Sequence, residues 1–232
     1  MEEELKKAVV LLSGGLDSTT CLAFAVSKGY EVHALSFDYG QKHSCELKYA
    51  KYNAKKYKAF EHKVAKLDRK FFSGSSLTDK NIQVRKDSYS ESEIPNSYVP
   101  ARNTVFLSYG LAYAETIGAE HIFIGVNSID YSGYPDCRPE FISAYQKMAN
   151  LAIKNAVVKK IRIKIETPLM RLKKSEIIII GKKLGVDYSK TISCYDPIDG
   201  KACGHCDSCI LRRRGFEESG YDDETVYKKE MR

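Results

Sequence analysis

The chain of 232 residues is 43% hydrophobic and 29% charged, which is typical of a soluble globular protein with one sizeable core. No apolar run is long enough to span a membrane, and the acidic start lacks the regions of a signal peptide, so we expect a cytoplasmic protein. The net charge of +7 is spread along the chain and does not distinguish nucleic acid from small anions as ligands. In that compartment the seven cysteines are expected to be thiols or metal ligands rather than disulfides.

A glycine-rich turn near the N-terminus is the first feature with chemical content. Residues 9–12 are all apolar and predict a buried strand of a parallel sheet. The next six residues, 13–18, read SGGLDS; the glycines allow positive φ and a close ligand, and Asp17 or Ser18 suits a helix N-cap. A helix is expected over residues 20–28. A strand, a glycine turn and a helix N-terminus in succession favour the binding of an anion.

The remainder of the chain alternates between predicted strands and predicted helices. Strands are expected over residues 31–37, 60–67, 121–125 and 161–165, and helices over residues 44–57, 105–117, 140–158 and 173–184. Residues 73–100 show neither periodicity and predict either a lid over a substrate or a variable surface loop. This alternation predicts an α/β fold with a doubly wound parallel sheet, in which ligands bind at the carboxyl ends of the strands.

A turn-rich segment near the C-terminus gathers four cysteines: Cys194, Cys203, Cys206 and Cys209. Thiolates at C-x2-C spacing reach one ion at about 2.3 Å each, and four of them fill a tetrahedral structural zinc site. An iron–sulfur cluster also takes four thiolates and is the alternative. His205 lies between two of these cysteines and is interpreted as a bystander. Cys21 is expected in the core of the protein. Cys137 lies in the loop at residues 127–139, which we interpret as functional.

The turn at residues 13–18 matches neither the Walker A pattern, which needs a lysine after the glycines, nor G-x-G-x-x-G. It resembles the S-G-G-x-D-S loop of the PP-loop ATP pyrophosphatases, which have an adenine nucleotide alpha-hydrolase-like fold and cleave ATP between its α- and β-phosphates. The alternative is an ordinary turn made of small residues. The resemblance implies ATP contacts from the residues of this loop and the start of the next helix: Leu12, Ser13, Gly14, Gly15, Leu16, Asp17, Ser18, Thr19, Thr20, Cys21 and Leu22.

Within that superfamily nearly the whole chain is similar to the 7-cyano-7-deazaguanine synthases, which make a precursor of queuosine and archaeosine. The similarity lies in residues 12–22, 37–41, 99–103, 130–138, 167–176 and 194–216. Two departures are visible: Ala101 stands where glycine is expected, and residues 73–98 match poorly. Neither departure touches the phosphate loop. The resemblance implies a ligase that converts 7-carboxy-7-deazaguanine, ammonia and ATP to the nitrile, with Mg²⁺ on the ATP and a structural Zn²⁺.

The resemblance also implies roles for individual residues. Asp17, Lys174 and Arg102 are the catalytic candidates: the two cations would clamp phosphates, and Asp17 would either cap the helix or hold Mg²⁺. The alternative for both cations is a solvated charge at a helix start. Substrate recognition is expected from a group in one loop: Tyr131, Tyr134, Asp136 and Arg138. Turn-forming residues explain the same loop without any ligand.

The expected organisation is a PP-loop catalytic domain at residues 1–186 with a zinc-binding segment at residues 187–232 packed on it. Members of the family are usually homodimers, and we expect no stable nucleic acid partner and no membrane. A PP-loop enzyme acting on tRNA, such as a thiolase or a lysidine-forming ligase, is the main alternative and fits the basic run at residues 212–214. Against it, no separate RNA-binding module remains once the catalytic domain is assigned. A zinc-ribbon nucleic-acid-binding protein without catalysis is the third possibility.

Overall fold

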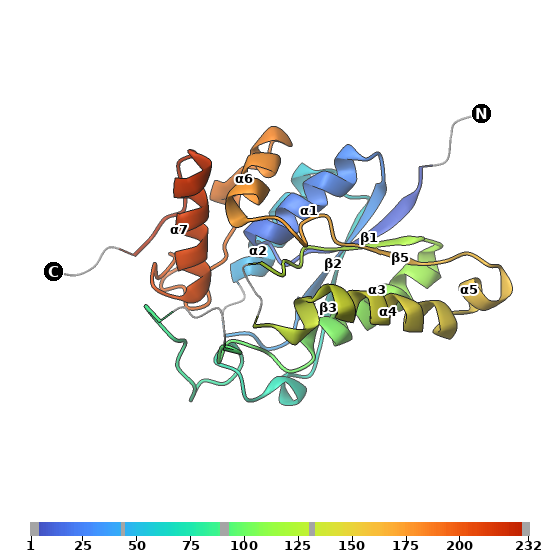
Figure 1. Cartoon of the computed structure of the whole chain (residues 1–232), viewed down its shortest axis with the longest axis horizontal. Helices are drawn as coiled ribbons and strands as arrows, with labels where there is room; N and C mark the ends of the chain where they lie inside the picture. Colours follow the sequence, from blue (N-terminus) through green and yellow to red (C-terminus); the bar gives the residue numbers. More distant parts are fainter. Residues whose placement is uncertain (1–4, 43–44, 89–92, 130–132, 229–232) are drawn as a thin grey trace.

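A five-stranded parallel sheet forms the centre of the molecule in the residues that the computed structural model describes, 5–42, 45–88, 93–129 and 133–228 (Figure 1). Its strand order is β3-β2-β1-β4-β5, and each neighbouring pair is parallel. The strands are β1 (Lys7–Leu11), β2 (Glu31–Asp38), β3 (Glu61–Lys66), β4 (His121–Ile124) and β5 (Lys164–Glu166). The chain builds outwards from β1 to β3, then returns to place β4 on the other side of β1. The predicted doubly wound sheet is confirmed.

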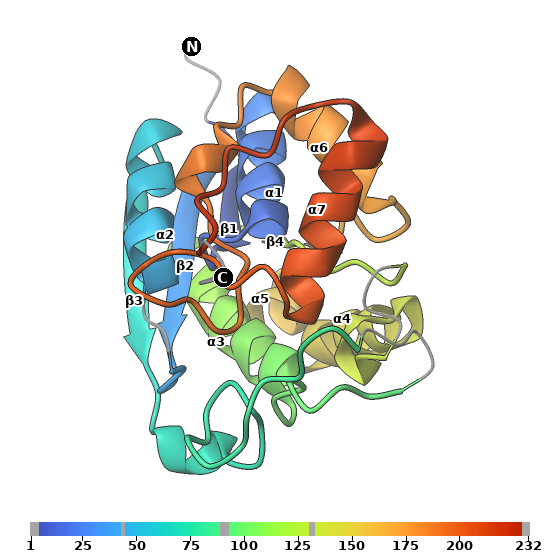
Figure 2. The ribbon, with the colours of Figure 1, turned by 90° about the vertical axis from the view of Figure 1, so that its left-hand side faces the viewer.

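Helices cover both faces of the sheet, because alternate residues of β1 point in opposite directions. Ala8 and Val10 are fully buried in a core shared with the helices of one face, whereas Val9 and Leu11 belong to the core of the other. The first face carries α1 (Leu16–Ser27), α2 (Cys45–Lys56) and α6 (Lys174–Lys183), with α7 (Asp207–Ser219) packed outside α6 (Figure 2). The second face carries α3 (Arg102–Ile117), α4 (Pro139–Ala152) and α5 (Lys154–Val158). Short 3₁₀ turns are η1 (Arg69–Phe72), η2 (Pro135–Cys137) and η3 (Tyr188–Lys190).

Two predicted elements differ from the observed ones in the region before β5. The single helix expected over residues 140–158 is wrong, because the backbone is extended at Ile153 (φ −93°, ψ 142°), which separates α4 from α5. The strand expected over residues 161–165 begins only at Lys164. The reason is the amide of Asn150 on α4, which bonds both the N–H and the C=O of Ile163 at 2.9 Å and holds it away from β4. Helix α7 was not predicted at all.

In its described residues, 73–88 and 93–101, the segment between η1 and α3 is irregular, as its sequence predicts, and its first part is anchored to the rest of the fold. Ser75 and Ser76 are fully buried, and Leu77 is 7% exposed. Lys42 holds the segment from the end of β2: its N–H donates to the carbonyl of Leu77 at 2.9 Å, and its Nζ donates to the carbonyl of Ile82 at 2.7 Å. These contacts anchor residues 75–82 to the connection after β2, and the role of a lid over a substrate stays a prediction. Among the described residues, no helix has the length and apolar character needed to cross a membrane.

The packing of α6 against α1 depends on a glycine. A Cβ added to Gly181 would lie 1.8 Å from the Tyr188 hydroxyl and 3.0 Å from Thr20 Oγ1. Tyr188 is fully buried, and its hydroxyl lies 2.8 Å from Thr20 Oγ1 and donates to the carbonyl of Ile177 at 3.2 Å. Tyr188 therefore occupies the space that a side chain at position 181 would need.

Gly181→Ala is expected to lower the free energy of unfolding by about 1–3 kcal/mol, because the new methyl group overpacks this site. The better helix propensity of alanine, worth about 1 kcal/mol, acts in the opposite direction. Urea denaturation measures the change, with Gly110→Ala in α3 as the control, where the nearest atom to an added Cβ is a leucine methyl at 3.2 Å. A Gly181→Ala protein as stable as the wild type would contradict this packing.

Candidate active site

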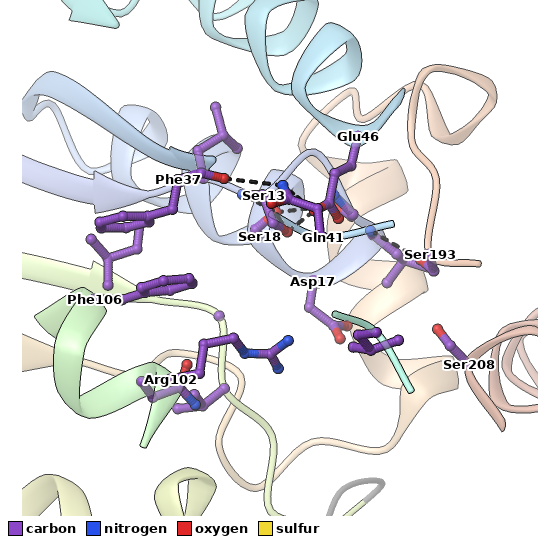
Figure 3. Close-up of a pocket in the computed structure, with 18 of the residues that line it drawn as sticks. Ser13, Asp17, Ser18, Phe37, Gln41, Glu46, Arg102, Phe106, Ser193 and Ser208 are labelled. Atoms are coloured by element: carbon purple, nitrogen blue, oxygen red, sulfur yellow. Dashed lines mark hydrogen bonds between the residues drawn. The ribbon is translucent and has the colours of Figure 1, made fainter. Parts of the chain in front are cut away.

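A cavity of about 240 Å³ lies at the carboxyl ends of β1 and β4, where the strand order reverses (Figure 3). Open α/β sheets bind their ligands at this switch point. The cavity is lined by the loop between β1 and α1, the connection from β2 into α2, the start of α3, the end of β4, and residues 192–195 and 208 of the C-terminal segment. Segments far apart in the sequence therefore meet around one space.

Of the two glycines in the loop after β1, Gly14 has the positive φ that the sequence predicts and Gly15 does not. Gly14 has φ +87°, and a Cβ there would lie 2.3 Å from the carbonyl oxygen of Glu46 in the first turn of α2. Gly15 is extended (φ −80°, ψ 172°) and is the N-cap of α1, with no side-chain capping bond. The prediction that Asp17 or Ser18 caps this helix is wrong, since both lie inside its first turn.

Hydroxyl groups and backbone amides converge at the N-terminus of α1. Ser13 Oγ and Ser18 Oγ are 2.9 Å apart, and the N–H of Leu16 donates to Ser193 Oγ at 3.4 Å. Such an arrangement at a helix N-terminus favours an anion such as phosphate. The predicted ATP residues that line the cavity are Leu12, Ser13, Gly15, Leu16, Asp17 and Ser18.

The remaining predicted ATP residues lie outside the cavity lining. Gly14 is buried against α2, as described above. Because the helix turns away from the cavity after its first turn, the following four residues are fully buried in the core: Thr19, Thr20, Cys21 and Leu22. The Thr20 hydroxyl donates to the carbonyl of Leu16 at 2.9 Å. The core position expected for Cys21 is confirmed.

Asp17 and Lys174 form an ion pair, with the lysine Nζ 2.8 and 2.9 Å from the two carboxylate oxygens. Lys174 is 6% exposed, and the side chain of Asp17 is 18% exposed. Lys174 is therefore not a solvated charge at a helix start. It lies behind Asp17 at the beginning of α6, while Asp17 itself lines the cavity.

The wall opposite the loop is aromatic and cationic. Arg102, the first residue of α3, points into the cavity and donates from Nη1 to the Tyr39 hydroxyl at 3.4 Å (Figure 3). Phe37 and Phe106 stack with their ring centres 3.9 Å apart and their planes 3° apart. Tyr134 is 4% exposed and shares a hydrogen bond of 2.8 Å with Ser97. This wall suits a planar, anionic ligand.

The start of α3 is held by Asp136, one of the residues that were predicted to bind substrate. Asp136 Oδ2 accepts from the N–H of Asn103 at 3.0 Å, so this carboxylate satisfies the helix N-terminus and is not part of the cavity lining. Arg138 is exposed and also does not line the cavity. Tyr131 lies outside the described residues. Ala101 has φ +51°, a conformation that favours glycine and accounts for the glycine expected there.

Glu46 lines the cavity and was not among the predicted site residues. Glu46 reaches the cavity from the first turn of α2, and Gln41 Nε2 donates to its Oε1 at 3.0 Å. Burial raises the pKa of the Glu46 carboxyl to about 7, although the Arg102 guanidinium and the hydrogen bond from Gln41 act in the opposite direction. Along the sequence, Glu46 looks like any glutamate at a helix start, and only its position after the strand end at residues 37–41 gives a signal.

The four predicted metal ligands do converge. Their Sγ atoms lie within 4.8 Å of one another: Cys194, Cys203, Cys206 and Cys209. Backbone N–H groups donate to these sulfurs; the bonds from Cys203 to Cys194 Sγ (3.1 Å) and from Tyr195 to Cys206 Sγ (3.4 Å) are examples. Donors aimed at sulfur stabilise thiolates, the form that binds a metal. His205 Nδ1 lies 3.0 Å from Asp87 and is not a member of the cluster, as predicted.

The cysteine cluster is joined to the cavity. Cys194 belongs to the cluster and also lines the cavity. Its neighbours Ser193 and Tyr195 form part of the cavity wall together with Ser208 from α7. The irregular segment before α3 contacts the same region through Lys86, whose Nζ lies 3.0 Å from Asp196 Oδ2. The C-terminal segment therefore closes one side of the site.

Comparison with known proteins shows that almost the entire chain is similar to one family. The family model described as "Queuosine biosynthesis protein QueC" matches residues 7–220. The 7-cyano-7-deazaguanine synthase of Citrifermentans bemidjiense is 59% identical over 225 residues, covering 97% of this chain and 99% of that protein. The protein of the same name from Saccharophagus degradans is 57% identical over 223 residues, covering 96% and 98%.

Solved structures support the fold. A structure described as a predicted subunit of tRNA methyltransferase from Methanocaldococcus jannaschii has a TM-score of 0.50 at 20% identity, covering 97% of this chain and 93% of its own. NMN synthetase from Francisella tularensis gives 0.52 at 18% identity, covering 94% and 78%. At such identities the likeness shows the fold alone. The sequence relatives show more: this chain belongs to the QueC family, the 7-cyano-7-deazaguanine synthases of queuosine biosynthesis.

Proposed function

We propose that the protein makes 7-cyano-7-deazaguanine from 7-carboxy-7-deazaguanine, ammonia and ATP. The observation that carries this proposal is a single cavity with two different walls, in a chain of the QueC family. One wall is a phosphate-type loop at a helix N-terminus, and the other is aromatic with one guanidinium. The alternative of a PP-loop enzyme acting on tRNA is not favoured, because the relatives carry the synthase name.

The reaction needs two activations. A carboxylate is a poor acyl donor, since oxide is a poor leaving group, so attack on the α-phosphate of ATP forms an acyl adenylate and releases pyrophosphate. Ammonia then displaces AMP to give the amide. A second adenylation, on the amide oxygen, lets that oxygen leave with AMP and gives the nitrile. Catalysis of this kind depends on positioning and on charge stabilisation.

The loop wall would hold the departing pyrophosphate. Ser13, Gly15 and Ser18 offer hydroxyl and amide donors at the helix N-terminus. Lys174 would neutralise charge on the β- and γ-phosphates from behind, and Asp17 would hold Mg²⁺ that accompanies ATP. Their ion pair keeps both side chains in place at the cavity edge.

The aromatic wall would bind the deazaguanine. Tyr134 offers a ring surface, and Tyr131 is proposed to act with it. We assign the substrate carboxylate to Arg102, because Arg102 lines the cavity and Arg138 does not. The carboxylate and the α-phosphate meet during activation, so one guanidinium can serve both. Asp136 would act indirectly by fixing the start of α3.

The remaining assignments concern the metal and the whole molecule. We propose that the cysteine cluster binds a structural Zn²⁺, because four sulfur donors fill a tetrahedral site and leave no open position. We further propose a PP-loop catalytic domain at residues 1–186 and a zinc-binding segment at residues 187–232, a cytoplasmic homodimer without stable nucleic acid or membrane partner, and a product that serves queuosine or archaeosine.

Lys174→Met is expected to lower the rate of pyrophosphate release by about 10²–10³-fold, the usual effect of removing one stabilising charge from a site. The variant also leaves Asp17 unneutralised beside the phosphates. Release is measured with saturating 7-carboxy-7-deazaguanine and ATP. Lys173→Met, at the exposed neighbouring position, is the control and should behave like the wild type. Unchanged kinetics in Lys174→Met would remove the ion pair from the mechanism.

Cys206→Ser is expected to lose the metal and to lower the melting temperature, because metal binding contributes folding free energy to such segments. Elemental analysis of the wild type should give one zinc per chain. Cys45→Ser, outside the cluster, should keep the metal. Iron with sulfide in the wild type, or a metal-free protein of full stability, would contradict the assignment.

The stoichiometry tests the proposed function directly. We expect two AMP and two pyrophosphate for each nitrile formed from the acid, because each carboxyl oxygen leaves as part of an adenylate. Synthetic amide supplied with ATP and no ammonia should give the nitrile at a cost of one AMP. Mass analysis of the products measures both. If the acid reacts and the amide gives no nitrile, the scheme of two activations is wrong.

A further inference from the structure

The proposed reaction removes every proton of ammonium from its nitrogen before the nitrile is complete. Ammonium at neutral pH carries no free electron pair, because its pKa lies well above neutrality, as those of other ammonium groups do. One proton has to leave before the nitrogen can attack the acyl adenylate, and the others leave as the amide and then the nitrile form. The cavity therefore needs a proton acceptor close to the reacting carbon.

Few groups of the cavity can accept these protons. Among the described residues that line it, the carboxylates are Asp17 and Glu46, and none is a histidine. Asp17 is paired with Lys174 at 2.8 Å and is assigned to Mg²⁺ in the proposed function. Burial raises the pKa of the Cys137 thiol to about 12, which leaves it protonated. Glu46 remains, and in the described part of the chain it forms no ion pair.

Glu46 is held in a fixed position beside the phosphate loop. Its backbone carbonyl oxygen lies 2.3 Å from where a Cβ on Gly14 would be, so the first turn of α2 touches the loop. Gln41 orients the carboxylate at 3.0 Å and is itself anchored, because its Oε1 accepts from the N–H of Tyr39 at 2.9 Å and its Nε2 donates to the carbonyl of Phe37 at 3.1 Å. Figure 3 shows Glu46 reaching from α2 towards the same space as Ser13 and Ser18.

The groups around Glu46 keep its carboxyl able to exchange a proton near neutral pH. The charged and titratable neighbours are Tyr39 at the end of β2, Cys45 on α2 and Arg102 on α3. Burial, the largest influence, raises the pKa of Glu46 to about 7. A general base works best when its pKa lies near the working pH.

We propose that Glu46 is the catalytic proton acceptor for the nitrogen nucleophile, an assignment that rests on the proposed function. Its carboxylate binds ammonium and takes one N–H proton, and the freed electron pair forms the C–N bond to the acyl adenylate. The C–O bond to AMP breaks, AMP leaves with that bonding pair, and a second N–H proton passes to solvent to give the amide. After the proton on Glu46 has also passed to solvent, the same carboxylate takes an N–H proton from the adenylated amide. The last N–H proton goes to solvent as the C≡N bond forms, the C–O bond breaks and the second AMP leaves with that bonding pair.

The test separates nitrogen chemistry from ATP chemistry in Glu46→Gln. Hydroxylamine replaces ammonia in one arm, because it is already unprotonated at neutral pH and gives a hydroxamate without help from a base. We expect amide formation from ammonia to fall by about 10²–10⁴-fold, the usual contribution of a general base. Hydroxamate formation and the exchange of pyrophosphate into ATP with 7-carboxy-7-deazaguanine should both stay near the wild-type rates.

The controls decide between this role and others. Glu140→Gln changes an exposed glutamate in the first turn of α4, outside the cavity, and should leave all three rates unchanged. Loss of pyrophosphate exchange in Glu46→Gln, equal loss of hydroxamate and amide, or normal use of ammonia would each overturn the proposal. A wild-type protein that activates the acid and forms no nitrile would instead overturn the proposed function, while its amide-forming rate still tests Glu46. A wild type that forms neither adenylate nor amide would overturn both.

Discussion

The buried ion pair between Asp17 and Lys174 connects the phosphate loop to the C-terminal third of the chain. Lys174 is 6% exposed, and a buried charge without its partner costs several kcal/mol, so changing either residue alone also lowers the free energy of unfolding. The same lysine fills the space beneath Gly215 of α7, where an added Cβ would lie 2.4 Å from its Cγ. The charge at the loop and the position of α7 therefore depend on one side chain.

That position matters because α7 begins in the cysteine cluster. Cys206 is its N-cap and Cys209 lies in its first turn, while Ser208 between them reaches the cavity. On its outer side α7 is held by Arg212, which is 2% exposed and bonds Asp223 at 3.1 Å and Thr191 at 2.9 Å. A metal that holds the cluster together would thus also hold the cavity wall formed by residues 192–195 and Ser208.

The two walls of the cavity are built by opposite faces of the sheet. The loop wall belongs to α1 and α2, whereas the wall with Arg102 belongs to α3, and the reversal of strand order between β1 and β4 opens the space between them. Gly125 at the end of β4 allows α1 to come close, since a Cβ there would lie 3.0 Å from the amide nitrogen of Ser18. An activation step that joins a nucleotide to a second anion needs such a two-sided site.

Local features of the sequence were enough to predict the five strands, the helices before the cysteine segment apart from the break at Ile153, and the two main motifs. The apolar run at residues 9–12 and the glycines after it identified the strand and the phosphate loop, because backbone conformation there depends on nearest neighbours. The spacing of the cysteines predicted their cluster for the same reason. Asn150, a distant group, displaced the start of β5, whereas Asp17 was misplaced locally, because α1 begins at Leu16 and Asp17 lies inside its first turn.

The sequence by itself determined the order of the strands and of the helices up to α6, the loop after β1, and which four cysteines come together. Only the tertiary structure decided which polar residues face the cavity. Lys174 was expected as a phosphate clamp or a solvated charge and is buried against Asp17. Asp136 was expected to bind substrate, but it accepts a hydrogen bond from the first turn of α3 and does not line the cavity. Glu46 lines the cavity although it was not predicted as a site residue. The physical reason is that sequence periodicity predicts which side chains share one face of a helix or strand. The packing of α2, α3 and α6 around the switch point decides which of those side chains line the cavity.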